Sequence, residues 1–279
     1  MLGKLFRNEF KNTYKPVMII FLSLLILTVV NCIAAAFNST RLGDTLSFKI
    51  FSGTFNTMYV ISMVIMGIAV IAVLCIAFYK SMYSSQGYLT HTLPVKPVVT
   101  FTVKLTVSLI WMMLSGIVML ISLFLFICAQ SGVNPFTALA KFFEVLPEGY
   151  AHLKVICLEE LGIRVGLLIF ELIAAIVISI LGTFLFIYTS LTIGQLSSQH
   201  KVGMSVVAGV ALYLVRQIVS SVMFVSTFFR VSDFFDTSSK VFDAGVNGVI
   251  VNGILVALAI VVIEYVADVF IVNKHINLQ

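Results

Sequence analysis

The stretch Val17–Phe37 reads VMIIFLSLLILTVVNCIAAAF and contains no charged residue over 21 positions. An α-helix needs about 20 mostly apolar residues to cross the hydrocarbon core of a bilayer, whereas the apolar core of a cleaved signal peptide is shorter. No clear small-residue cleavage site follows Phe37. We therefore expect Val17–Phe37 to be a retained first transmembrane helix.

The rest of the chain has the same character. Of its 279 residues, 60% are hydrophobic and only 10% are charged, and the mean hydropathy is +1.12. A soluble globular protein is about half apolar and about a quarter charged, so this chain has too few charges to cover a surface that faces water. The composition excludes a soluble protein and predicts an integral membrane protein.

The expected fold class is an all-α integral membrane protein with six transmembrane helices. Six apolar segments are long enough to cross the bilayer, and only a helix satisfies its own backbone hydrogen bonds when lipid surrounds it. We place the six spans at about residues 17–37, 57–79, 105–129, 165–191, 204–228 and 247–272. The 279 residues together are expected to form a single transmembrane domain.

Residues 1–16 predict an amphipathic helix in front of the first span. One helical face carries Leu2, Leu5, Phe6 and Phe10, and the other carries Lys4, Arg7, Asn8 and Lys11. A basic amphipathic helix beside a span tends to lie in the membrane interface, here on the cytoplasmic side. Interpreting the same residues as a simple basic topology signal leads to the same orientation.

The distribution of Lys and Arg predicts that both termini are cytoplasmic. With the N-terminus inside, the inner segments carry nine Lys and Arg and the outer segments carry seven, in the direction of the positive-inside rule. Residues 80–104 are then the longest cytoplasmic connection, and Pro97 fits the first turn of the helix that leads into span three. Residues 130–164 form an extracellular loop, where apolar spacing over Phe136–Val145 predicts a partly amphipathic helix.

The stretch Tyr79–Val95 interrupts two long apolar runs. It has no acidic residue and is broken by Gly87 and Pro94. Its first part has three apolar side chains at helical i, i+3, i+4 spacing, namely Tyr79, Met82 and Tyr83. A short polar segment with a small apolar face, held between two spans, suits docking to a protein outside the bilayer.

Within this stretch, Gly87–Val95 reads GYLTHTLPV. It resembles the "GYLT-x-TLPV" signature that follows the second span in permease subunits of type 2 ABC exporters, particularly the small single-domain ones of Gram-positive bacteria. Six spans with an amphipathic start are similar to that family as well. In the family, this segment is the coupling helix and its exit, which seats on a separate ATPase subunit. Gln86 stands where relatives often carry an acidic residue, so no salt bridge to the ATPase is expected there.

The resemblance implies the membrane-spanning permease subunit of an ATP-driven exporter, with a translocation path formed by two permease copies or paralogues. It implies a multi-pass protein of the bacterial cytoplasmic membrane whose partner ATPase binds ATP and Mg. The partners are then the ABC ATPase subunit, a second permease and the lipid bilayer, with no nucleic acid. The residues that the resemblance assigns to ATPase coupling are Tyr83, Ser84, Gln86, Gly87, Tyr88, Leu89, Thr90, Leu93 and Pro94.

Ionisable groups inside spans are costly, and each predicts either a functional site or a buried pair. The sequence has four, Glu171, Arg216, Glu264 and Asp268, of which the last two are four residues apart and share one face of span six. One hypothesis is a structural pair of Arg216 with either Glu171 or Glu264, which we favour. The alternative is an ion-coupled secondary transporter in which Glu171, Arg216 and Glu264 line a polar path.

Other chemistry has little support in the sequence. There is no Gly-x4-Gly-Lys-Ser/Thr loop to bind nucleotide phosphates, so the chain itself is not expected to be an enzyme and another chain would bind ATP. The four Cys and four His show no ligand spacing, and we expect neither a metal site nor a cofactor in this chain. A membrane anchor or sensor subunit without transport activity is a third class, for which no dedicated domain is evident.

Overall fold

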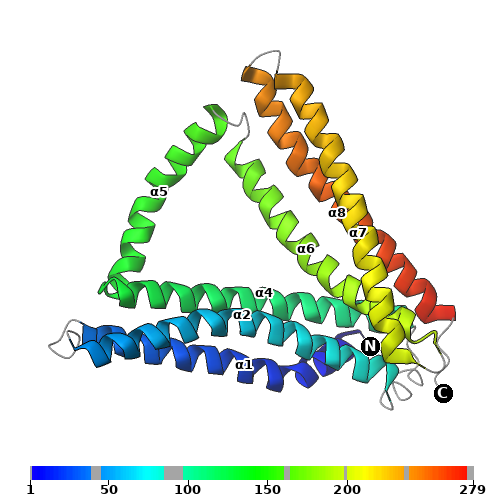
Figure 1. Ribbon diagram of the computed structural model, residues 1–279, viewed down its shortest axis with the longest axis horizontal. Coiled ribbons are helices and arrows are strands. Elements are labelled where there is room, and N and C mark those ends of the chain that lie inside the picture. The colour runs from blue at the N-terminus through cyan, green and yellow to red at the C-terminus, as the bar shows by residue number, and fades with distance from the viewer. Residues whose placement is uncertain are drawn as a thin grey trace. The chain divides into compact units, whose positions relative to one another are not determined.

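The computed structural model describes residues 2–38, 45–84, 97–159, 164–197, 200–235 and 239–274. Every regular element within these ranges is an α-helix (Figure 1). The helices are α1 (Leu2–Asn38), α2 (Leu46–Tyr83), α4 (Pro97–Gln130), α5 (Pro135–Glu159), α6 (Val165–Gly194), α7 (Lys201–Phe235) and α8 (Ser239–Lys274). The predicted all-α class is confirmed for the described part of the chain.

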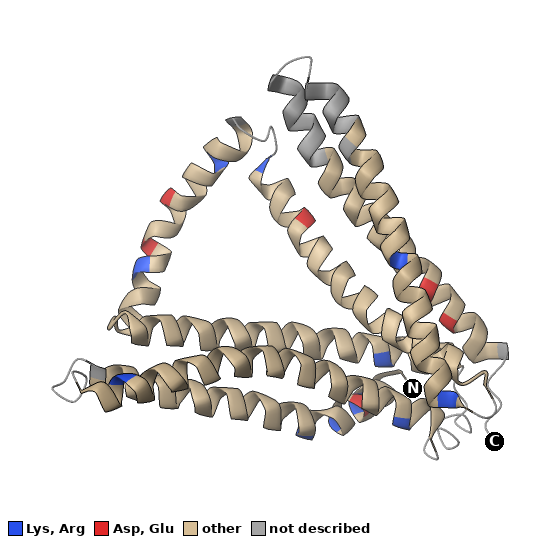
Figure 2. Ribbon diagram, viewed as in Figure 1, with Lys and Arg blue, Asp and Glu red and all other residues tan. Residues whose placement is uncertain are grey.

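Six of these helices, all except α5, are long and apolar enough to cross a membrane. Each of the six predicted spans lies within one of them, in the order α1, α2, α4, α6, α7 and α8. Figure 2 shows how sparse charged residues are along the described parts of these helices. The chain is a multi-pass membrane protein.

The helices are longer than the predicted spans. Helix α2 begins at Leu46, where the sequence predicts a loop up to Asn56, and α7 continues to Phe235. Hydropathy marks only the part of a helix that suits lipid, whereas the backbone continues as helix until a residue breaks it. No proline lies between Leu46 and Asn56 to interrupt the first turns of α2.

Prolines at helix starts and inside helices behave differently from one another. Helix α4 begins at Pro97, as predicted, because a proline in the first turn removes only an N–H that has no partner there. Helix α1 runs without a break through Pro16, so residues 2–16 continue directly into the first span. Helix α5 runs through Pro147 to Glu159, well beyond the predicted segment Phe136–Val145.

The chain divides into two compact units, which are described separately. Unit 1 comprises Met1–Ala77 and Thr106–Pro147, and unit 2 comprises Phe78–Leu105 and Glu148–Gln279. In unit 1, α1, α2 and α4 lie side by side (Figure 1). Three of their polar side chains meet in the core: the Ser122 hydroxyl lies 2.7 Å from both Thr28 Oγ1 and the Tyr59 hydroxyl, and all three residues are buried.

The single tryptophan joins α1 to α4 within unit 1. The ring of Trp111 on α4 stacks on Phe10 with 4.4 Å between centroids, and its Nε1–H donates to Thr13 Oγ1 at 2.8 Å. Trp111 is buried, so its N–H needs such a partner. The predicted amphipathic segment therefore uses Phe10 and Thr13 to pack on a membrane-spanning helix.

In unit 2, α6 contacts both α7 and α8, which also contact each other. Small residues allow α6 and α7 to approach closely at two levels. A Cβ added to Gly194 would collide with Ser205 Oγ and come within 2.7 Å of the Ser205 backbone nitrogen. One helical turn further from the α6–α7 connection, a Cβ on Gly209 would lie 3.3 Å from Ser190 Oγ. The two helix backbones are therefore almost in contact near the α6–α7 turn.

Gly194→Ala should destabilise the α6–α7 pair, because the new methyl group meets backbone atoms that cannot rotate away. We expect a loss of about 1–3 kcal/mol, the usual cost of overpacking, observed as a lower midpoint of thermal unfolding in detergent. Gly203→Ala is the matched control, since its added Cβ would have no neighbour closer than 3.9 Å. Equal midpoints for the two variants would contradict the close approach at Gly194.

Candidate functional site

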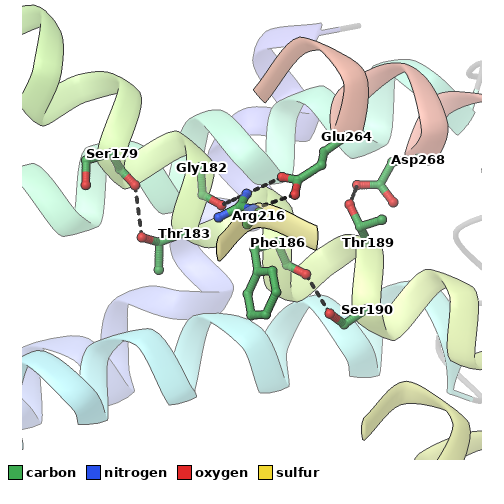
Figure 3. Close-up of polar contacts among 9 residues, drawn as sticks. All are labelled: Ser179, Gly182, Thr183, Phe186, Thr189, Ser190, Arg216, Glu264 and Asp268. Atoms are coloured by element: carbon green, nitrogen blue, oxygen red, sulfur yellow. Dashed lines mark hydrogen bonds and ion pairs between the residues drawn. The ribbon is translucent and has the colours of Figure 1, made fainter. Parts of the chain in front are cut away.

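The α6–α7–α8 bundle of unit 2 brings together most of the ionisable groups that the sequence singles out. Arg216 on α7 donates from Nε to Glu264 Oε1 on α8 at 2.7 Å, and its Nη2 forms an ion pair with Glu264 Oε2 (Figure 3). Nη2 also donates to the backbone carbonyl of Gly182 on α6 at 2.8 Å. One guanidinium therefore links all three helices.

The surroundings of Arg216 explain why it can be accommodated inside a span. Its Cζ lies 5.0 Å from the ring centroid of Phe186, which adds a cation–π contact. Gly182 allows α6 to lie close to α8, since an added Cβ would lie 3.3 Å from Val261 Cγ2, whereas its distance of 3.9 Å to Arg216 Nη2 would be an ordinary contact. Of the two partners that the sequence allows for Arg216, the structure has Glu264.

Asp268 lies one helical turn beyond Glu264 on α8 and faces α6. Its Oδ2 accepts a hydrogen bond from Thr189 Oγ1 at 2.9 Å (Figure 3). The side chain is fully buried, and Oδ1 has no hydrogen-bond partner among the described residues. The shared face predicted for Glu264 and Asp268 is confirmed, because both carboxylates point into the bundle.

Glu171 is separate from this network. It lies on α6, is buried, and its Oε2 lacks a partner within the described part of the chain. Its spacing to Ala175, Ile178 and Gly182 places it on the α6 face that turns towards α7 and α8. The predicted alternative pair of Arg216 with Glu171 is not formed in the structure.

The end of α2, where the predicted coupling segment begins, is attached to the same bundle. Phe78 stacks on Tyr188 of α6 with 3.7 Å between ring centroids. The Tyr83 hydroxyl lies 2.7 Å from Thr192 Oγ1, which itself donates to the Tyr188 carbonyl, so Tyr83 is the donor. Two successive turns of α2 therefore contact the last turns of α6.

The start of α4, where the predicted segment ends, reaches α6 and α8. Phe101 packs edge-on against both Phe78 and Tyr188, at 5.9 and 6.1 Å between centroids. Thr102 Oγ1 lies 2.9 Å from the Tyr265 hydroxyl of α8. Both helix ends that flank the segment are thus joined to the bundle that holds Arg216 and Asp268.

Of the nine residues assigned to ATPase coupling, the structure describes two, Tyr83 and Ser84. The others, Gln86, Gly87, Tyr88, Leu89, Thr90, Leu93 and Pro94, lie outside the described residues. Thr192 and Thr189 of α6, which bind Tyr83 and Asp268, are not among the residues that the sequence predicts as functional. A polar run at the end of an apolar helix was the available signal, Tyr188-Thr189-Ser190-Leu191-Thr192.

Among the described residues, no group of three or more His, Cys, Asp or Glu side chains is arranged to hold a metal ion. Comparison of the chain with protein-family models, curated proteins and solved structures gives no match. The bundle geometry and the Gly87–Val95 sequence motif are therefore the basis for a proposed function.

The Arg216–Glu264 pair predicts a distinctive pattern of stabilities. Arg216→Leu or Glu264→Leu alone leaves an uncompensated charge in the bundle and should cost about 3–5 kcal/mol, whereas the double variant should cost much less than the sum. The measurement is SDS-induced loss of helicity, followed by circular dichroism. Glu171→Leu is the control, because that carboxylate has no ionic partner among the described residues and its removal leaves no charge behind. Additive effects of the two single changes would refute the pair.

Proposed function

We propose that this chain is the membrane-spanning permease subunit of an ATP-driven ABC exporter of the bacterial cytoplasmic membrane. Two copies, or a copy and a paralogue, form the translocation path, and the stretch Tyr79–Val95 docks a separate ATPase that binds ATP and Mg. The observation that carries the proposal is the Gly87–Val95 motif after the second span, flanked by helix ends that are both joined to the α6–α7–α8 bundle.

These contacts supply a physical route for coupling. ATP-driven movement of the ATPases displaces the docked segment, and the ends of α2 and α4 move with it. Tyr83 and Phe78 pass the displacement to α6 through Thr192 and Tyr188, and Thr189 passes it to α8 through Asp268. The side chains on this route are packed aromatic rings and short hydrogen bonds, which transmit a shift rather than absorb it.

The pairing of two copies follows from the same proposal. Because a single six-span bundle has no obvious two-sided pathway, the route for the substrate runs between two permeases that rock against each other. A closed dimer with twofold symmetry is the commonest arrangement for such a pair. Both termini and the docking segment are cytoplasmic, as the Lys and Arg distribution predicts.

The direct test is co-expression of the chain with its candidate ATPase. The two should co-purify, and the permease should stimulate ATP hydrolysis. Replacement of Gly87 or Leu93 by a charged residue should abolish both effects. Failure to co-purify, together with unchanged stimulation in those variants, would contradict the proposal.

Tyr83→Phe separates docking from transmission. It removes the hydroxyl that donates to Thr192 without changing the ring, so the ATPase should still co-purify while its stimulation falls by roughly two- to tenfold, the effect of one hydrogen bond. Tyr79→Phe is the matched control one turn earlier on α2. Equal stimulation in both variants would show that Tyr83 does not transmit the movement.

A second candidate function is an ion-coupled secondary transporter, which is favoured by the buried carboxylates. Glu171 Oε2 and Asp268 Oδ1 have no partner among the described residues, as expected of groups that bind and release a proton. This function requires transport by the purified chain alone in vesicles, abolished by a protonophore and by Asp268→Asn. Transport that needs an ATPase and ignores the protonophore would exclude it.

A further inference from the structure

A pocket of about 590 Å³ that is open on one side lies between α6, α7 and α8, next to Arg216, and is called the cavity below. Its volume falls in the usual range for sites that bind one small ligand, about 300–1,000 Å³. Most of its wall is apolar, with aliphatic and aromatic side chains such as Ile178, Phe224 and Ile254. Each of the three helices also contributes polar side chains, and these are Ser179, Thr183, Arg216, Ser220, Thr227 and Asn252.

Several of these polar groups have unused hydrogen-bonding capacity. The hydroxyls of Thr183 and Thr227 donate to carbonyls of their own helices. The side chains of Ser179, Ser220 and Asn252, in contrast, form no hydrogen bond within the described ranges of the chain. Arg216 uses Nε and Nη2 for Glu264 and Gly182, which leaves Nη1 with two free N–H donors. Unpaired polar groups at membrane depth are tolerated where they line a cavity with polar contents.

The charges next to the cavity restrict what it can hold. Arg216 is the one ionisable residue in its described lining, and Glu264 already neutralises that charge. A bound anion would compete with Glu264 for the guanidinium, and a bound cation would meet a positive group without a carboxylate in the lining. An uncharged group that accepts hydrogen bonds from Nη1 and exchanges others with Ser179 and Ser220 fits without disturbing the ion pair.

We propose that this cavity is a binding site for an uncharged membrane amphiphile, with a hydroxyl or ester head group and an acyl chain. The head group lies at Arg216, where Nη1 donates to its carbonyl oxygen, and Ser179 and Ser220, each about one helical turn away on α6 and α7, bond its hydroxyls. The acyl chain lies along the apolar wall formed by the three helices. The site depends on the geometry of this bundle alone and does not require the ATPase coupling proposed above.

Three probes with the same sixteen-carbon chain test the head-group preference: monopalmitoylglycerol, hexadecyl sulfate and hexadecyltrimethylammonium. Each is radiolabelled and bound to the full chain in lipid nanodiscs, and specific binding is the part lost when the cavity is filled. Specific binding of monopalmitoylglycerol should be at least about tenfold tighter than that of either charged probe, an affinity difference that one or two hydrogen bonds can supply. Equal affinities, or tighter specific binding of a charged probe, would overturn the proposal.

Gly253→Phe is the variant that fills the cavity. Gly253 lines the cavity, and a Cβ placed on it meets no atom within 4 Å, so the new ring has space to enter. The matched control is Gly248→Phe on the same helix, where an added Cβ is equally free but the residue does not line the cavity. Monopalmitoylglycerol binding should be lost in the first variant and kept in the second. Retained binding in Gly253→Phe, or a changed oligomeric state without lost binding, would overturn the site.

Ser220→Ala provides a second test with a substitution of similar size. It removes one polar group from the lining and should weaken monopalmitoylglycerol binding about threefold to tenfold, with little effect on the charged probes. The Ser220 side chain makes no hydrogen bond to described residues, so the folded bundle should keep its thermal midpoint. An unchanged affinity for monopalmitoylglycerol would contradict the assigned role of the polar lining, even if Gly253→Phe failed to fold.

Discussion

A charged guanidinium inside a membrane-spanning bundle is the constraint on which unit 2 depends. Arg216 carries a charge that hydrocarbon cannot solvate, so the surrounding helices must supply its partners. Glu264 on α8 provides two of them, and the Gly182 carbonyl on α6 provides a third. These bonds are directional, and they hold only for one register of α7 against α8 and one rotation of α6. Aliphatic packing alone would tolerate several neighbouring registers.

That register determines what lies one turn further along. Because α8 is fixed at Glu264, Asp268 comes opposite Thr189, and the adjacent turns of α6 present Tyr188 and Thr192 to the end of α2. The aromatic cluster of Phe78, Phe101 and Tyr188 fills the space beside these hydrogen bonds. The ion pair and the helix ends that flank the predicted docking segment are therefore parts of one packed unit.

The sequence predicts the parts of this unit that depend on one helix at a time. Hydropathy identifies the spans, and the i, i+4 spacing places Glu264 and Asp268 on one face. The sequence does not show whether Glu171 or Glu264 is the partner of Arg216, since the pairing depends on the register between helices. Thr189 and Thr192 escape notice because short hydroxyl residues are common in spans and usually bond their own helix. The cavity cannot be predicted from the sequence either, because it is formed by the packing of three helices against one another.

Arg216 belongs to both the ion pair and the cavity, and this double position links the two functions proposed for the bundle. Nε and Nη2 are held by Glu264 and Gly182, whereas Nη1 is the nitrogen left for a ligand. Any shift of α8 along α7 strains the bonds to Glu264 and turns the planar guanidinium, so Nη1 moves with it. In the proposed coupling, a displacement at the predicted docking segment would reach the polar end of the cavity, because Thr189 and Asp268 tie α8 to the part of α6 that contacts α2. On these proposals, the same bonds that make the charge tolerable in the membrane would also couple the cavity to helix movement.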